Sequence, residues 1–319
     1  MEFLLSLPPN LVSQFHSIEK KSSKSWFCTH DPDGSKLGSG GGTAHLLHAA
    51  WQDSEDKESF PDWLDKKRIL VHAGGQSRRL PAYAPAGKIL TPIPVFRWAR
   101  GQKLQQNLLD LQMPLLQDVM DSCPPSLTTL IASGDVLIRS TGDLPPLPEV
   151  DVLCMGIWVK PERVSKHGVF FIHRDQPDQL AFALQKPGPE LLRTRAQEYN
   201  FMIDVGIWIL SEKAVSVLMK KCGWNAETQQ FERELPDYYD LYTDFGLSLG
   251  EQPSVPDPEV QALSCAVVPL PKGEFYHFGT SAELIESSLE LQNCIQDQRE
   301  ILHRYIKPQP NLFVLNSET

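Results

Sequence analysis

Cationic side chains and paired glycines follow one apolar run of the chain. The run Ile69 to Val71 leads into residues 72–81 (HAGGQSRRLP), and Lys88 comes shortly after. Guanidinium and ammonium groups bind phosphate oxygens, and glycines let the backbone approach an anion closely. Surface arginines are ordinarily solvated, but here they coincide with glycines and a lysine. The pattern predicts an anion site that a triphosphate would fill, made by Gly74, Gly75, Ser77, Arg78, Arg79 and Lys88.

A second glycine-rich run stands at the start of a predicted helix. Residues 38–43 read GSGGGT, and apolar residues then recur at helical spacing from Leu46 to Trp51. Successive backbone amides and the positive end of a helix can hold phosphates. The run lacks the G-K-[ST] ending of a Walker loop, and a plain turn is the alternative. On the first interpretation, the nucleotide-binding residues are Gly38, Ser39, Gly40, Gly41, Gly42 and Thr43.

Three further polar residues stand at the ends of predicted strands. Asp135 follows the apolar run 127–132, where the carboxylate of an α/β protein can hold a metal that bridges phosphates; a turn or cap aspartate is the alternative. Lys186 closes a predicted hairpin and can pair with a phosphate as a point charge. His277, in residues 275–280 (FYHFGT), is a candidate ligand for a metal or a substrate, or a partly buried core histidine.

Strand-like apolar runs alternate with helical patterns, as in a doubly wound α/β sheet. Strands are predicted at residues 26–28, 69–71, 127–132, 152–159, 205–210 and 262–270, with a hairpin made by 168–172 and 180–184. Helices are predicted around residues 46–51, 104–111, 211–221 and 282–305. Pro114 is expected to end or kink the second of these, because proline has no amide proton. Residues 227–258, rich in acids and tyrosines, give no clear pattern.

Composition excludes several classes of protein. The 319 residues suffice for one large or two modest domains, and the net charge of −10 disfavours a nucleic-acid partner. The six cysteines contain no C-x-x-C pair, which indicates a reducing compartment. Glu2 and the early prolines are unlike a secretory signal, and no apolar run approaches 18 residues. We therefore expect a cytoplasmic globular protein without a membrane or nucleic-acid partner.

The order of these motifs resembles that of the sugar-phosphate nucleotidyltransferases, in particular the fucose-1-phosphate guanylyltransferases and bifunctional fucokinase/GDP-fucose pyrophosphorylases. The strings that carry the resemblance are residues 37–43 (LGSGGGT), 73–88 (AGGQSRRLPAYAPAGK), 100–112 (RGQKLQQNLLDLQ) and 276–280 (YHFGT). The resemblance implies an α/β, Rossmann-like nucleotidyltransferase fold with a mixed, mostly parallel sheet flanked by helices. It places this domain at residues 1–295, and residues 296–319 would be a helix end and the beginning of a C-terminal β-helix region, followed in the bifunctional proteins by a sugar kinase.

The resemblance also implies roles for the phosphate-binding residues. Arg79 and Lys88 match the arginine and lysine of the superfamily pattern G-G-x-G-T-R-L...K, and would be the catalytic pair. Ser77 replaces the last glycine of that pattern and Arg78 its threonine. Residues 40–43 keep the glycines and the threonine, but Ala44 stands where arginine is expected. One motif is thus divided between two loops.

The remaining roles concern the metal and the sugar phosphate. Asp135 matches the metal-binding acid of the G-D motif, and Lys186 the lysine of the E-K-P motif, with Gln185 in place of its glutamate. Asp204 stands where the sugar site is completed. His277 stands where a second metal-binding aspartate is common in the family. Either the reaction uses one metal ion, or His277 is itself a metal ligand.

The reaction implied by the resemblance transfers a guanylyl group from GTP to L-fucose 1-phosphate with Mg²⁺. A phosphate monoester dianion is itself a nucleophile, so that alignment and charge stabilisation would carry catalysis. Two alternatives are another nucleotidyltransferase, which uses UTP or a different sugar, and a non-catalytic nucleotide-sugar-binding domain. A dinucleotide-dependent dehydrogenase would leave Arg78, Arg79 and Lys88 without a purpose. The sequence predicts no oligomeric state.

Overall fold

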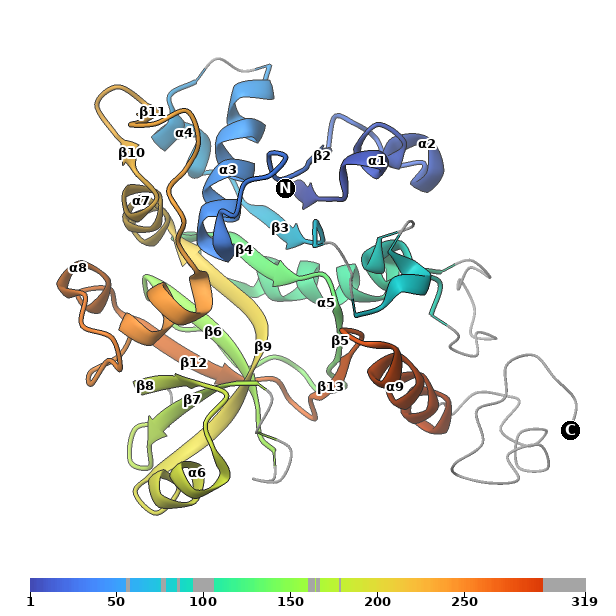
Figure 1. Ribbon diagram of the computed structural model, residues 1–319. Coiled ribbons are helices and arrows are strands. Elements are labelled where there is room, and N and C mark those ends of the chain that lie inside the picture. Colours follow the sequence, from blue (N-terminus) through green and yellow to red (C-terminus); the bar gives the residue numbers. More distant parts are fainter. Residues whose placement is uncertain are drawn as a thin grey trace, which may run out of the picture.

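The computed structural model describes residues 1–55, 58–75, 79–84, 87–93, 106–159, 164, 167–177 and 179–294. Within these residues a nine-stranded sheet runs through the molecule, with helices on both of its faces (Figure 1). This agrees with the predicted α/β class.

The main sheet is mixed, and most of its strands run in one direction. Its hydrogen-bonded order is β12 (Cys265–Pro269), β6 (Val152–Ile157), β9 (Tyr199–Ser211), β4 (Leu127–Ser133), β3 (Arg68–His72), β1 (Glu2–Ser6) and β2 (Trp26–Thr29). Only β9 runs against its neighbours on this path. The strands β7 (Gly168–His173) and β8 (Leu180–Gln185) form an antiparallel hairpin that pairs with β9. The predicted sheet and hairpin are therefore confirmed.

Helices cover the two faces of the sheet unequally. On one face lie α3 (Gly38–Asp53), α4 (Phe60–Leu64) and α7 (Glu212–Lys221), and on the other lies α5 (Leu108–Ser122). Shorter helices are α1 (Pro9–Val12), α2 (Phe15–Glu19), α6 (Pro189–Arg195) and α8 (Pro258–Gln261), and α9 (Ser281–Cys294) follows the last strand. Two-residue strands β10 (Trp224–Asn225) and β11 (Gln230–Phe231) pair beside α7.

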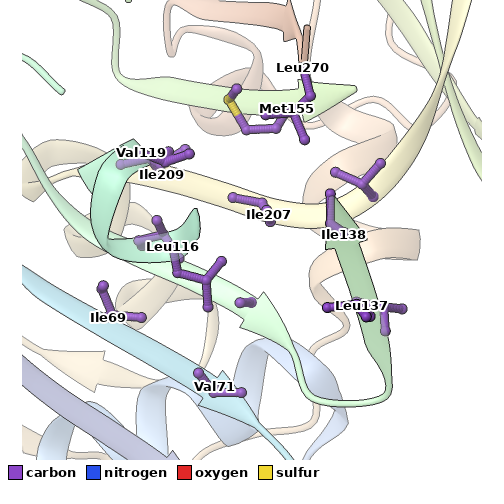
Figure 2. Packing of buried hydrophobic residues seen from close by; sticks show 14 of the residues in the cluster. Ile69, Val71, Leu116, Val119, Leu137, Ile138, Met155, Ile207, Ile209 and Leu270 are labelled. Atoms are coloured by element: carbon purple, nitrogen blue, oxygen red, sulfur yellow. The ribbon is translucent and has the colours of Figure 1, made fainter. Parts of the chain in front are cut away.

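Alternating side chains along each central strand build two cores. Along β3, Ile69 and Val71 belong to the cluster under α5, whereas Leu70 belongs to the cluster under α3, α4 and α7. A strand buried on both faces reads as a continuous apolar run, which is why the sequence predicted β3, β4 and β6. Figure 2 shows Leu116 and Val119 of α5 near Ile69 of β3 and Ile209 of β9. These two layers fix the carboxyl ends of the strands in place.

Some elements differ from the prediction. The strand β1 was not predicted, and β9 begins at Tyr199 rather than near residue 205. The helix α5 begins after Asn107, whose side chain accepts a hydrogen bond from the amide of Asp110 at 3.0 Å, and it continues past Pro114 to Ser122. The helix therefore does not end at Pro114, which was one of the two predicted outcomes; the other, a kink, stays a prediction. An internal proline costs about 3 kcal/mol, but burial of Leu116, Val119 and Met120 at about 1.5–3 kcal/mol each outweighs that cost.

Other predicted elements agree more closely. Ser211 caps α7 by accepting a hydrogen bond from the amide of Ala214 at 3.2 Å, at the predicted start of that helix. The predicted C-terminal helix is present as α9, and its expected continuation to residue 305 lies outside the described residues, as do residues 296–319. The unassigned segment 227–258 contains a π-helical turn, Leu241–Phe245, and a 3₁₀ turn, Gly246–Ser248.

Two short strands outside the main sheet bring distant parts of the chain together. The strand β5 (Val136–Arg139) follows Asp135 directly and pairs antiparallel with β13 (Glu274–His277). The register sets His277 opposite Val136, and the amide of Phe278 donates to the carbonyl of Asp135 at 2.8 Å. This ribbon therefore places His277 beside Asp135.

None of the helices in the described ranges has the length and apolar character needed to cross a membrane. The cysteines for which the structure gives a side chain, Cys28, Cys123, Cys154, Cys222 and Cys265, are free thiols.

Candidate active site

A pocket of about 540 Å³ opens beside the carboxyl ends of β4 and β8. In open α/β sheets this edge is where ligands bind. Its walls carry both cations and carboxylates, so that a charged ligand would find partners of either sign. The lining residues are Arg79, Ser133, Asp135, Val136, His167, Gly168, Gln185, Lys186, Asp204, Val205, Gly206, Asp240, Tyr242, Thr243, Phe275, His277 and Glu283.

The carboxylate of Asp135 is the centre of a polar network. Its Oδ1 accepts a hydrogen bond from the Ser133 hydroxyl at 2.8 Å, and its Oδ2 lies 3.3 Å from Nζ of Lys88 and 3.5 Å from Nε2 of His277. Burial by itself would raise the pKa of Asp135, but the His277 ring, the Lys88 ammonium and the Ser133 hydroxyl outweigh it and hold that pKa well below its usual range. Asp135 is therefore an anion at neutral pH.

Lys88 joins two parts of the site. The residue begins a 3₁₀ turn, Lys88–Leu90, and its ammonium group also donates to the carbonyl oxygen of Gly279 at 3.3 Å. Its side chain is 15% exposed, so that the charge is screened only in part by water. This ammonium group contacts both Asp135 and the segment that leads into α9.

His277 lies between two carboxylates. Its Nδ1 is 3.1 Å from Oε1 of Glu283, on the first turn of α9, while Nε2 faces Asp135. Burial lowers the pKa of the imidazole, but the two carboxylates outweigh that effect and raise the pKa above its ordinary value. The structure therefore brings together Lys88, Asp135 and His277, which the family resemblance assigned to one site.

Asp204 forms part of the pocket wall on β9. Its Oδ1 accepts hydrogen bonds from the amide of Gly206 at 2.8 Å and from the indole of Trp208 at 3.1 Å. Burial raises its pKa to about 6, although both hydrogen bonds act in the opposite direction. The residue is 8% exposed. Its carboxylate thus has protein partners and also borders the space where a ligand can sit.

Two exposed cations complete the pocket rim. Lys186 follows β8 with a left-handed backbone (φ 48°), a conformation that costs a non-glycine residue about 1–3 kcal/mol. The carbonyl of His167 accepts a hydrogen bond from its amide at 3.1 Å. Arg79 also lines the pocket, and its carbonyl accepts a hydrogen bond from the amide of Ser281 at 3.2 Å.

The glycine-rich run 38–43 has a different environment from the one expected. It forms the first turns of α3, and the amides of Gly40 and Gly41 both donate to the carbonyl of Tyr239 at 2.9 Å. A Cβ on Gly41 would lie 2.8 Å from the carbonyl oxygen of Asp237. These two amides, expected to turn toward a ligand, serve close packing against residues 237–239 instead.

The other residues of this run also have protein partners. The Ser39 hydroxyl donates to Oδ2 of Asp240 at 3.1 Å, and that of Thr43 contacts Nε2 of His72 at 2.8 Å. Gly38 has a left-handed backbone (φ 73°), and Gly42 is buried. Residues 38–43 do not line the described pocket, but Ser39 holds Asp240, which does.

The second glycine-rich run is described in part. The amide of Gly74 donates to the Ser6 hydroxyl at 3.1 Å, and a Cβ on Gly75 would meet no atom within 4 Å. Ser77 and Arg78 lie outside the described residues. Gly74 therefore packs against β1, and the space beside Gly75 is open.

Several lining residues were not predicted. Glu283 stands six residues after His277 in the first turn of a helix, a spacing that sequence reasoning could have tested. Tyr242 and Thr243 come from the π-helical turn in the unassigned segment 227–258, and Asp240 caps that turn; the segment has no regular periodicity. Gln185, which stands where the resemblance expects a glutamate, also lines the pocket.

The donor set fits a magnesium ion held jointly with phosphates. Among the described residues no group of three or more His, Cys, Asp or Glu side chains is arranged to hold a metal by itself. Magnesium is usually bound by one or two carboxylates together with substrate phosphates, and Asp135 is an ionised carboxylate in the pocket.

An α/β sheet that gathers these charges at its carboxyl edge is suited to bind phosphate-bearing ligands. Comparison of the sequence with family models identifies the family, since residues 61–255 match the fucose pyrophosphorylase domain. The chain belongs to this family. The β13 strand and α9, which contribute His277 and Glu283, lie outside the matched residues.

Curated relatives agree with the family. The chain is 55% identical over 318 residues to the L-fucokinase/L-fucose-1-P guanylyltransferase of Bacteroides fragilis. The alignment covers 99% of this chain and 33% of that protein. It is 30% identical over 155 residues to the mouse fucose-1-phosphate guanylyltransferase, covering 46% of this chain and 23% of that protein. The chain thus spans about a third or less of the length of these relatives. Among solved structures, HddC from Yersinia pseudotuberculosis complexed with GMP-PN is 11% identical, with 89% of this chain and 75% of that chain covered and a TM-score of 0.40.

Proposed function

We propose that this domain transfers a guanylyl group from GTP to L-fucose 1-phosphate, giving GDP-L-fucose and pyrophosphate. The choice of nucleotide and sugar is supported by the activities for which the relatives are named. The observation that carries the proposal is the presence of Arg79, Lys186 and the ionised Asp135 in the wall of one pocket, with the Lys88 ammonium group in contact with Asp135.

The reaction needs two anions to meet. A phosphate oxygen of the sugar 1-phosphate attacks the α-phosphorus of the triphosphate, a new P–O bond forms, and the bond from the α-phosphorus to the bridging oxygen breaks. Pyrophosphate leaves with the electron pair of that bond. Because the attacking phosphate is a dianion, no general base is needed, and the protein contributes alignment and positive charge.

The pocket offers separate cations for the two phosphate groups. Arg79, together with Lys88 beside Asp135, would bind the triphosphate, and Lys186, at the end of β8, would bind the sugar phosphate. Asp204 would complete the sugar site from β9. Gly74, Gly75, Ser77 and Arg78 remain our candidates for contacts to the nucleotide, as do Gly38, Ser39, Gly42 and Thr43. Gly40 and Gly41 are no longer candidates, because their amides donate to the carbonyl of Tyr239.

We further propose that Mg²⁺ takes part, held by Asp135 and with His277 as a candidate second ligand. Bound there, the ion would supply positive charge to the phosphates of the nucleotide. The Ser133 hydroxyl keeps one carboxylate oxygen of Asp135 fixed, and Lys88 and His277 share the other.

The setting of the domain is also a proposal. The longer relatives, named for fucokinase as well as guanylyltransferase activity, support a partnership with a kinase domain that would supply fucose 1-phosphate. The free cysteines of the described residues support a reducing, cytoplasmic location.

The test is pyrophosphate release with GTP, UTP or ATP against the 1-phosphates of fucose, mannose and glucose, with and without Mg²⁺. Asp135→Asn removes the carboxylate charge, and Asp143→Asn is a matched control at an exposed position away from the pocket. Release with GTP and fucose 1-phosphate alone, lost in Asp135→Asn but not in Asp143→Asn, is the expected result. A preference for another pair would reassign the substrates, and binding of GDP-fucose without any release would favour a non-catalytic domain.

A further inference from the structure

A single helix holds both the backbone and the side chain of His277. The Ser287 hydroxyl donates to the carbonyl oxygen of His277 at 2.8 Å, and Oε1 of Glu283 lies 3.1 Å from Nδ1 of its ring. Glu283 and Ser287 are four residues apart, and so they project from the same side of α9. The N-terminal half of α9 therefore fixes where His277 lies and how its ring is turned.

The imidazole of His277 packs against Gly279, a residue without a side chain. A Cβ on Gly279 would lie 2.8 Å from Nε2 of His277 and 3.0 Å from Oε2 of Glu283. Any side chain at position 279 would therefore displace the ring or the carboxylate. The side chains of His277 and Glu283 are 24% and 19% exposed, so their contact lies largely out of water.

The opposite edge of the ring faces Asp135. Nε2 is 3.5 Å from Oδ2 of Asp135, the same oxygen that Lys88 contacts at 3.3 Å. Glu283 also lines the pocket, and it contacts the imidazole at Nδ1, whereas Asp135 faces Nε2. Its position is that of an outer partner that fixes a histidine facing a reaction centre.

We propose that Glu283 is a positioning residue, which keeps Nε2 of His277 directed at the Asp135 carboxylate and thereby holds that carboxylate in place for the reaction. This inference rests on the proposed function. Loss of such outer partners commonly lowers activity about 10- to 100-fold. Because an oxygen of Glu283 lies 3.1 Å from Nδ1, a neutral side chain that keeps an oxygen there should preserve most of the effect.

Three variants separate positioning from other roles. Glu283→Ala removes the acceptor, Glu283→Gln keeps an oxygen that can accept from Nδ1, and Glu286→Ala removes an exposed glutamate from the next part of the same helix. We expect kcat to fall about 10- to 100-fold in Glu283→Ala with little change in the KM of either substrate. Glu283→Gln should recover most of that loss, and Glu286→Ala should behave as the unchanged protein. Thermal melting identifies any variant that fails to fold.

A second readout needs no turnover. The ¹⁵N resonance of His277 Nδ1, assigned by its absence in His277→Gln, should move in Glu283→Ala and stay in Glu286→Ala. An unmoved resonance, or equal kcat in Glu283→Ala and Glu286→Ala, overturns the inference. If the unchanged protein turns over no substrate pair while the resonance moves as expected, the proposed function falls and the positioning of His277 by Glu283 stands.

Discussion

Lys88 and Asp135 are 47 residues apart in the chain, and the ammonium nitrogen of one lies 3.3 Å from a carboxylate oxygen of the other. The lysine follows the loop after β3, and the aspartate follows β4, the next strand in the sheet. Parallel strands end at the same edge, and this brings the two loops together. The pair is therefore a direct product of sheet topology.

Removal of the Lys88 charge should reduce turnover far more than stability. We expect Lys88→Ala to lower kcat about 100- to 1,000-fold, the range for loss of one charge-stabilising group from a water-excluded site. Lys213→Ala is the matched control, because Lys213 pairs with Asp151 at 2.8 Å but is 62% exposed and lies away from the pocket. Initial rates at saturating substrates, with circular dichroism to verify folding, measure the effect. Equal rates in the two variants would remove Lys88 from the mechanism.

The role of the Lys186 charge can be tested against Lys272, a lysine with the same backbone conformation. Lys186 and Lys272 both have left-handed backbones, with φ of 48° and 49°, and both side chains are exposed. Replacement by glycine relieves the backbone strain but loosens the unfolded chain, so each variant should keep a similar stability. We expect Lys186→Gly to raise the KM for the sugar phosphate, with the KM for GTP unchanged. Lys272→Gly should leave both values unchanged, and a shift common to both variants would point to the backbone rather than the charge.

The local parts of this site were predictable from the sequence. Asp135 and Lys186 each follow a continuous apolar run, and such runs identify strands buried on both faces. Their side chains had to lie near the carboxyl edge or a hairpin end once the strands were assigned. Arg79 and Lys88 were found by composition, because the segment after β3 combines paired glycines, two arginines and a nearby lysine.

The pairing of distant short segments was not predictable in this way. The contact between His277 and Asp135 depends on two four-residue strands, β5 and β13, whose paired residues Arg139 and Glu274 are 135 positions apart. A four-residue strand carries too little periodicity to reveal its partner. The π-helical turn that carries Tyr242 and Thr243 has no repeating pattern at all.

Gly41 tests whether the glycine-rich run of α3 serves packing or phosphate binding. In Gly41→Ala the new Cβ would lie 2.8 Å from the carbonyl oxygen of Asp237, a backbone atom that cannot move cheaply. We expect a loss of about 1–3 kcal/mol in the free energy of unfolding, measured by urea denaturation. The KM for GTP should stay unchanged at low temperature, because the Gly41 amide already donates to Tyr239. A raised KM with unchanged stability would instead favour contact with the triphosphate.

The buried carboxylate of Asp204 should make stability depend on pH in a defined direction. Its folded pKa is about 6, against about 3.8 for the unfolded chain. Below pH 4 the group is protonated in both states, and it contributes no penalty. Between pH 4 and pH 6 the folded state holds a proton that the unfolded chain has released, so this contribution to stability falls as the pH rises. Above about pH 6 the penalty is complete, at about 3 kcal/mol for two pKa units.

Asp204→Asn removes this titration while its side-chain oxygen can still accept hydrogen bonds from Gly206 and Trp208. The free energy of unfolding of the variant, relative to that of the unchanged protein, should therefore increase from pH 4 to pH 6 and then stay constant. Asp151→Asn is a control of opposite sign: burial raises the pKa of Asp151, but Lys213 and Ser264 outweigh it and lower that pKa overall. Its stabilising contribution is present above pH 4 and is lost as the pH falls. A pH-independent difference between Asp204→Asn and the unchanged protein would show that the Asp204 carboxyl has an ordinary pKa in the folded state.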